Sequence, residues 1–164
     1  MNYNQLLKGY IIMTSQYWLL KTEPNEFSID DLKAKGSNGE PWDGIRNYQA
    51  RNFMREMAMG DTVLIYHSAC AVPAIVGEGK IIKTAYDDHF ALDPKSKYFD
   101  EKSSADKNRW SLVDVAFVEK WQKPVPLSTI KTVKALSEMK LVKQSRLSVS
   151  PVTADEYEVL ITLK

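Results

Sequence analysis

The order of apolar and polar positions divides the chain into short strands and short helices. In residues 61–67, Val63 and Ile65 alternate with Leu64 and Tyr66, so both sides of this predicted strand are apolar. A strand of this kind is typical of a barrel with helices packed around it. The same reasoning predicts further strands over residues 17–21, 74–84, 109–121 and 146–149.

Capping signals predict the helices between these strands. Ser28 followed by Asp31 resembles a capping box, and Asn47 is a credible N-cap. Thr153 with Glu156 forms a second capping box at the start of a last helix. The predicted helices cover residues 28–36 and 48–59, one or two short segments within 127–139, and the segment after Thr153. The pattern therefore predicts one α/β (α+β) domain.

The segment between the predicted strands 74–84 and 109–121 is polar. Residues 86–109 are rich in Asp, Lys and Ser. We therefore predict a long surface connection and not a core element. Loops of this length are usually functional or mobile.

Length and charge limit the classes of function. A chain of 164 residues with 44% hydrophobic content can form a core without a disulfide or a metal. The net charge of +1 excludes a general polyanion binder, but residues 120–146 carry seven Lys or Arg against one Glu, which is +6. Most of these lysines, including Lys131 and Lys134, fit a solvated surface. Arg146 lies beside a predicted strand and among small hydroxyl residues, so we expect it to point into a site.

The cysteine and histidine content gives no metal site. Cys70 is the only cysteine, and the two histidines, His67 and His89, lie on different predicted elements. We predict no cofactor, and we expect a reducing, cytoplasmic compartment.

We also expect a monomer with no membrane partner, since residues 1–13 form neither a signal peptide nor a membrane span. Residues 1–14 are predicted to be a weakly ordered extension, with Met13 as a candidate native start.

One stretch, residues 41–52, concentrates unusual chemistry around Gly44. It contains Trp42 and Tyr48, which offer flat stacking faces, and Arg46, which offers a planar cation. Asn47 would place these side chains at or beside the N-terminus of a helix, where unpaired N–H groups attract anions. These features fit a nucleobase with its phosphate. The alternative is that the aromatics belong to the core and the arginines are solvated.

Two other classes of function remain open. His67 and Ser68, with Asp43 or Glu23 elsewhere, provide the residue types of a hydrolytic enzyme acting on a nucleotide or small metabolite. However, Ser68 lacks the nucleophile elbow G-x-S-x-G, and neighbouring side chains on a strand point to opposite faces. The third class is a protein-interaction module that uses the basic segment 120–146. We favour a binding module without catalysis.

Several segments together resemble the EVE-domain family. They read YWLLKTEP at 17–24, WDGIRNYQARN at 42–52, GD at 60–61, YHS at 66–68 and SRLSV at 145–149. The resemblance spans residues 17 to about 162, within a predicted domain of residues 15–164. It implies a single PUA-like β-pseudo-barrel with short helices packed around it. It also implies binding of a modified base, such as a 5-substituted cytosine, in DNA or RNA.

The resemblance also implies which residues lie near an aromatic-walled, base-binding cavity. Trp42, Tyr48 and Trp18 would stack on the base. His67, Ser68 and Asn47 would read its edge, while Lys21, Arg46 and Arg146 would hold phosphate or close the cavity. The full predicted set is Trp18, Lys21, Glu23, Trp42, Arg46, Asn47, Tyr48, His67, Ser68, Trp110, Arg146 and Ser148.

Overall fold

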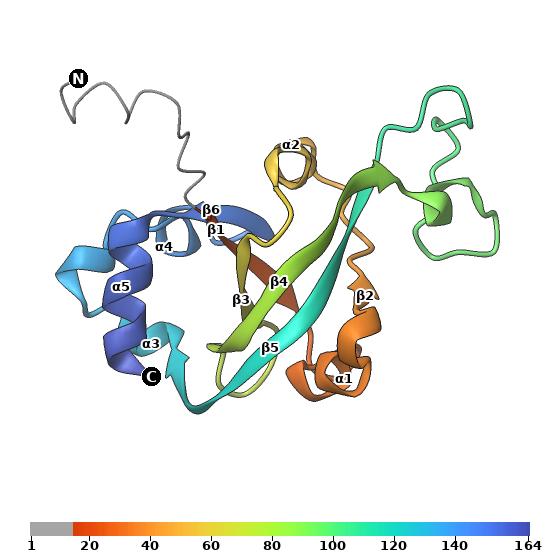
Figure 1. Ribbon diagram of the computed structural model, residues 1–164. Coiled ribbons are helices and arrows are strands. Elements are labelled where there is room, and N and C mark those ends of the chain that lie inside the picture. The colour runs from red at the N-terminus through yellow and green to blue at the C-terminus, as the bar shows by residue number, and fades with distance from the viewer. Residues whose placement is uncertain (1–14) are drawn as a thin grey trace, which may run out of the picture.

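The protein forms a mixed six-stranded sheet with short helices on both faces (Figure 1). A computed structural model describes residues 15–164. The strands are β1 (Tyr17–Thr22), β2 (Glu40–Pro41), β3 (Thr62–His67), β4 (Ala74–Asp87), β5 (Ser111–Pro126) and β6 (Val149–Val152), in the spatial order β2-β5-β4-β3-β1-β6. The helices are α1 (Ile29–Ala34), α2 (Tyr48–Glu56), α3 (Leu127–Ile130), α4 (Lys140–Lys143) and α5 (Ala154–Leu163), with 3₁₀ turns η2 (Gly36–Asn38), η3 (His89–Leu92) and η4 (Lys134–Leu136).

The strand pairing brings the two ends of the domain together at β1. This strand pairs in parallel with β3 and antiparallel with β6. The long strands β4 and β5 pair with each other, and β3 joins this pair through β4. Figure 1 shows β4 and β5 crossing the domain side by side, with the connection between them projecting beyond the sheet. The predicted α+β class is confirmed.

Alternation along the central strands produces two cores, one on each face of the sheet. Trp18 and Leu20 of β1 pack with α1 and α2 on one face. Leu19 packs on the other face with buried residues of α3, η4, α4 and α5. Because Leu19 and Leu20 are both fully buried, each contributes about 1.5–3 kcal/mol through the hydrophobic effect. The prediction that β3 is apolar on both sides is also confirmed, since Val63 and Leu64 lie in different cores.

The predicted helix starts are confirmed at atomic detail. The side chains of Ser28, Asn47 and Thr153 accept hydrogen bonds from the backbone N–H groups of Asp31, Ala50 and Glu156, at 3.2, 2.9 and 3.1 Å. Helix α2 ends at Glu56, before the predicted Met59, because the backbone of Met57 is extended (ψ 141°). Helix starts are thus encoded locally, by one side chain each.

Two of the strand boundaries that differ from the prediction lie at prolines. The last strand covers Val149–Val152 and not residues 146–149. It includes Pro151, which is tolerated because β6 is an edge strand of the sheet. Similarly, β5 continues through Pro124 to Pro126, where β2 no longer pairs with it. Proline stops a central strand, but an edge strand accommodates it.

The connection between β4 and β5 is more than a surface loop, so that prediction was wrong in part. Strand β4 continues to Asp87, and η3 follows. Asp88 and Ala91 are fully buried, and the N–H of Asp88 donates to the backbone oxygen of Trp110. The segment is polar in composition because its carboxylates are used inside the protein, as described below.

Some predictions have a more limited outcome. The predicted extension, residues 1–14, and the candidate start at Met13 lie outside the described residues. Within residues 15–164, no helix is long and apolar enough to cross a membrane. The same part of the chain contains no group of three or more His, Cys, Asp or Glu side chains placed to hold a metal ion.

Candidate functional site

A cleft of about 780 Å³ opens where β1, β3 and β6 meet the loop before α2. This volume lies within the range of small-ligand sites. Its lining comes from residues 21–23, 26–27, 40–45, 68, 97–98, 145–146 and 148. The strands hold these segments together, because the N–H of Lys21 donates to the oxygen of Ser148 and that of Ser68 to the oxygen of Thr22, both at 3.0 Å.

Three aromatic side chains contribute to the walls of the cleft. Phe27 and Trp42 meet edge to face, with ring centroids 6.2 Å apart and planes at 87°. Trp42 is only 6% exposed and also belongs to the core beneath the cleft, so it is a core aromatic that also lines the cleft. Its N–H donates to the oxygen of Val113 at 2.8 Å, which fixes the loop to β5. Tyr98, from the β4–β5 connection, lines the cleft as well.

Gly44 allows Tyr98 to approach the loop before α2. Its backbone has φ +78°, a conformation that other residues rarely adopt. A Cβ atom added to Gly44 would lie 2.7 Å from the ring of Tyr98. The absence of a side chain at Gly44 therefore allows the close approach of a distant chain segment.

The basic side chains of the cleft lie near the segment before β6. Lys21 Nζ donates to the backbone oxygen of Ser145 at 2.6 Å and lies 5.6 Å from the centre of the Tyr66 ring. Burial lowers the pKa of Lys21. Arg146 is exposed and lines the same cleft, as does Ser148. These groups supply donors on one side of the cleft.

Acidic side chains also line the cleft, and two of them are paired. Lys97 binds Glu26 at 3.2 Å, and Lys35 binds Glu40 at 3.1 Å. Among residues 15–164, no other residue forms a hydrogen bond or ion pair with the Asp43 carboxylate, to which only its own backbone N–H donates. Solvent reaches Asp43 through the mouth of the cleft, yet desolvation of its carboxyl group, followed by the nearby charges of Asp88 and Glu40, raises its pKa. The cleft therefore offers an acceptor that no other side chain uses.

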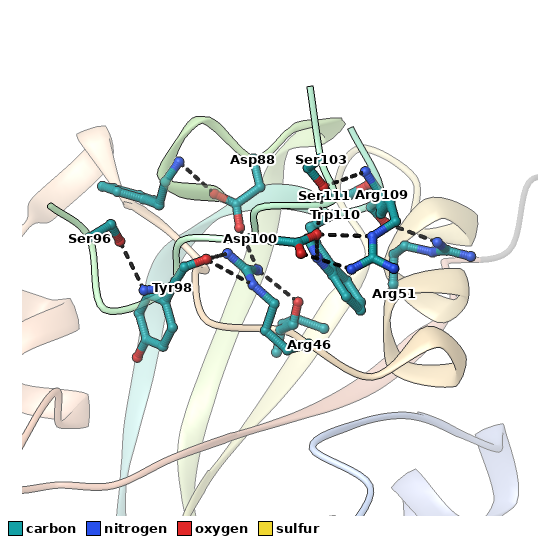
Figure 2. A network of polar contacts seen from close by, with 12 residues as sticks. Arg46, Arg51, Asp88, Ser96, Tyr98, Asp100, Ser103, Arg109, Trp110 and Ser111 are labelled. Atoms are coloured by element: carbon teal, nitrogen blue, oxygen red, sulfur yellow. Dashed lines mark hydrogen bonds and ion pairs between the residues drawn. The ribbon is translucent and has the colours of Figure 1, made fainter. Parts of the chain in front are cut away.

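Arg46 does not line the cleft but holds one of its lining residues, Tyr98, within the polar network of Figure 2. Its guanidinium donates twice to the backbone oxygen of Tyr98 and once to Asp88, at 2.8 Å in the latter case. Since Asp88 is completely buried, this is an internal ion pair. Arg46 thus fixes Tyr98 in the wall of the cleft, whereas the prediction for Arg46 was to hold phosphate or close the cavity.

Several predicted site residues lie outside the cleft. Trp18 is buried in the core, where its Nε1 donates to Asp61 at 2.9 Å. Trp110 is also buried, and its Nε1 donates to Asp100 at 2.8 Å. Tyr48 is 49% exposed and stacks on Trp110 beyond the cleft. The predicted residues that the structure does bring together are Lys21, Glu23, Trp42, Ser68, Arg146 and Ser148.

Asn47 and His67 each accept a hydrogen bond from the first turn of a helix. Asn47 caps α2 and borders a smaller hollow that shares Arg146 with the cleft. His67 Nε2 accepts the backbone N–H of Ile29 at 3.1 Å and so satisfies the first turn of α1. Burial lowers the pKa of His67, which favours the neutral imidazole that can accept this bond. Neither residue lines the larger cleft.

Two of the three aromatic residues that line the cleft, Phe27 and Tyr98, were not predicted from the sequence. Phe27 lies directly before Ser28, the N-cap of α1, and Tyr98 lies in the polar segment 86–109. The pair Tyr98 and Phe99, isolated among charged residues, is the only local signal that this segment carries recognition chemistry. Nothing in the sequence indicates that Tyr98 packs against Gly44.

The fold and the cleft together define a PUA-like α+β domain with an aromatic-walled site. Its fold is similar to that of the YTH domain of the Zygosaccharomyces rouxii MRB1 protein, solved with N6-methyladenosine RNA, at a TM-score of 0.50 and 15% identity over 92% of this chain and 87% of that one. At this identity the likeness concerns the fold alone.

The chain belongs to the EVE domain family, whose model matches residues 16–163. Thymocyte nuclear protein 1 of Mus musculus is 42% identical over 167 residues, covering 92% of this chain and 74% of that protein. The crystal structure of human THYN1 protein in complex with 5-methylcytosine-containing DNA is similar at a TM-score of 0.87, with 39% identity over 91% of this chain and 97% of that one. The predicted family is therefore confirmed.

Proposed function

We propose that this domain binds nucleic acid by holding a modified base, of the 5-substituted cytosine type, in the cleft. The observation that carries the proposal is the combination of Phe27, Trp42 and Tyr98 with polar groups in one cleft. Aromatic stacking contributes ~1–3 kcal/mol per base. The complex of a related human protein with 5-methylcytosine DNA supports this class of ligand and favours DNA over RNA as the first substrate to test.

The polar groups of the cleft suit the edge of a cytosine. The exocyclic amino group of cytosine is a donor, and Asp43 is an acceptor without another partner in the described chain. Arg146 and Lys21 suit the phosphate that follows the base. A base can reach this site only when it leaves its stack, which costs a few kcal/mol in a duplex and less in a single strand.

The geometry does not favour the hydrolytic alternative. Nε2 of His67 is occupied by the N–H of Ile29, so this nitrogen does not face Ser68 as a free base. Ser68 lines the cleft without an activating partner among the hydrogen bonds of the described residues. Binding without chemistry needs neither group to be activated.

Titration of matched oligonucleotides tests the proposal. We would measure affinity for DNA and RNA that carry cytosine, 5-methylcytosine or 5-hydroxymethylcytosine at one position. A methyl group that fills apolar space contributes ~1–3 kcal/mol, so the expected preference is about 10- to 200-fold. Equal affinity across the panel, or turnover of any of these ligands, would contradict the proposal.

A further inference from the structure

A row of aromatic rings and guanidinium groups leads from the cleft to helix α2. Figure 2 labels four of its members, Tyr98, Arg46, Trp110 and Arg51. The guanidinium carbon of Arg46 lies 5.6 Å from the ring of Tyr98 and 5.3 Å from the ring of Trp110. Trp110 stacks on Tyr48 at 5.1 Å, and the guanidinium carbon of Arg51 lies 4.8 Å from the ring of Tyr48. We call these five residues the cation–aromatic row.

The arginines nearest the β4–β5 connection are neutralised by carboxylates. Arg46 pairs with Asp88, and Arg109, beside the row, pairs with Asp100, each at 2.8 Å. Although burial alone would raise the pKa of Asp100, hydrogen bonds from Ser103, Arg109 and Trp110 hold it well below its ordinary value. These ion pairs are internal, and they order the connection that carries Tyr98.

Arg51, at the outer end of the row, and Arg55, four residues further along α2, have no such partner among residues 15–164. Arg51 donates to the backbone oxygen of Arg109 and to the amide oxygen of Asn52, and Arg55 donates to the hydroxyl of Ser111. These acceptors are all neutral, and within residues 15–164 neither arginine forms an ion pair with a carboxylate. Two positive charges therefore remain uncompensated at this end of the row.

Arg51 and Arg55 also repel each other. They are four residues apart on α2, a spacing that places like charges on the same side of a helix. Desolvation, followed by the positive charges of Arg55 and Arg109, lowers the pKa of Arg51. An anion placed between the two guanidinium groups would relieve this repulsion.

We propose that Arg51 and Arg55 bind backbone phosphates of the nucleic acid whose modified base lies in the cleft. The inference rests on the proposed function. Stacking on Tyr48 orients the Arg51 guanidinium, and a planar guanidinium suits phosphate oxygens. The row is at most roughly 20 Å long, which corresponds to about six nucleotides at a rise of 3.4 Å. The contacted phosphates therefore lie within about six nucleotides of the base in the cleft.

Oligonucleotide length provides the test. We would compare wild type with the double variant Arg51→Gln, Arg55→Gln on a trinucleotide and on a 12-mer, each carrying one 5-methylcytosine. The matched control is Lys131→Gln, Lys134→Gln, because both lysines are exposed on the segment that covers the opposite face of the sheet. Melting temperatures establish that every variant is folded.

The expected result separates length from base identity. For the 12-mer, the arginine variant should lose affinity on the order of tenfold at low salt, and the slope of log K against log salt should become shallower by about two. Its affinity for the trinucleotide, and its preference for 5-methylcytosine over cytosine, should equal those of wild type. The lysine control should behave as wild type throughout.

Other outcomes distinguish this inference from the proposed function. Unchanged 12-mer affinity and salt slope in the arginine variant would overturn the phosphate site and leave the base site intact. A second outcome is that wild type shows no preference for 5-methylcytosine while the arginine variant still has a shallower slope of log K against log salt. This outcome would overturn the proposed function and retain the phosphate contacts. Absence of binding to either oligonucleotide would overturn both. A folded Arg51→Lys variant with intermediate 12-mer affinity would support the role of stacking.

Discussion

Gly44 faces the ring of Tyr98 so closely that no side chain fits between them. A Cβ atom on Gly44 would lie 2.7 Å from the ring carbon that bears the hydroxyl group. The contact joins the loop before α2 to the β4–β5 connection, two segments that both line the cleft. The shape of the site therefore depends on one absent methyl group.

Gly44→Ala should reduce both stability and binding. The positive φ costs ~1–2 kcal/mol for an L-residue, and displacement of Tyr98 adds ~1–3 kcal/mol. Gly60→Ala is the control, because Gly60 has a similar φ of +82° but open space around its Cβ position. Urea unfolding should show the larger loss for Gly44→Ala, and only this variant should bind 5-methylcytosine DNA more weakly. Equal effects of the two substitutions would argue against the Tyr98 contact.

Trp42→Leu should weaken binding beyond its effect on folding. Trp42 belongs to the core as well as to the cleft, so some stability is lost, though less than the ~3–5 kcal/mol of a truncation to alanine. The lost stacking face should cost ~1–3 kcal/mol of binding free energy. Trp18→Leu is the matched control, since Trp18 is buried away from the cleft. Affinity measured on folded protein should fall for Trp42→Leu and stay unchanged for Trp18→Leu.

Asp43→Asn should stabilise the free protein at neutral pH. Because the pKa of Asp43 is raised in the folded protein, its stabilising effect is present below its ordinary value of 3.8 and is lost as the pH rises through the raised value. At pH 7 the ionised group therefore costs stability, and the asparagine variant should melt at a higher temperature. This advantage should shrink towards pH 3.

The same substitution also tests the base contact. Asparagine at position 43 presents donors as well as an acceptor, so the preference for cytosine derivatives should fall if Asp43 accepts from the amino group. Asp106→Asn, in the exposed β4–β5 connection, is the control and should change neither property. A variant that is more stable and also binds with unchanged base preference would remove Asp43 from the recognition set.

His67→Ala should destabilise the fold in a pH-dependent manner. The substitution leaves the N–H of Ile29 without its acceptor, which costs ~1–3 kcal/mol for a buried group. Because burial lowers the folded pKa of His67, its contribution is full above the ordinary value of 6.5 and is lost as the pH falls through the lowered value. The difference between wild type and variant should therefore be larger at pH 8 than at pH 5. His89→Ala, at an exposed position, should show no such trend.

The sequence predicted those parts of the fold that depend on neighbouring residues. Ser28, Asn47 and Thr153 each start a helix through one hydrogen bond to a residue three positions away. Alternation identified β3 and its two apolar faces for the same reason. The predicted strand boundaries were wrong at Pro151 and Pro124. A strand tolerates proline only where it has no hydrogen-bonding neighbour on one side, and the sequence does not show which strands are neighbours.

The site was predicted less completely because its walls come from distant segments. Trp42, Lys21 and Arg146 lie where the motifs implied, in one cleft. Tyr48 lies within the motif stretch 42–52, yet the first turn of α2 directs it to Trp110 and away from the cleft. Tyr98 lines the cleft in its place, and Arg46 holds it there through two hydrogen bonds. Composition had assigned Tyr98 to a surface connection. No local pattern encodes such a contact.

The residues that line the cleft are spread along almost the whole described chain, so ligand binding depends on folding of the complete domain. Its lining begins at Lys21 and ends at Ser148, and the pairing of β1 with β6 that joins these ends spans almost the complete described sequence. No partial fold contains the site, and such distant pairings form slowly because a long loop must close first. A ligand of the cleft must therefore stabilise the native state as a unit, by ~2.7 kcal/mol at a hundred times its dissociation constant. Ligand binding in the cleft should then slow the hydrogen exchange of backbone amides in both β1 and β6.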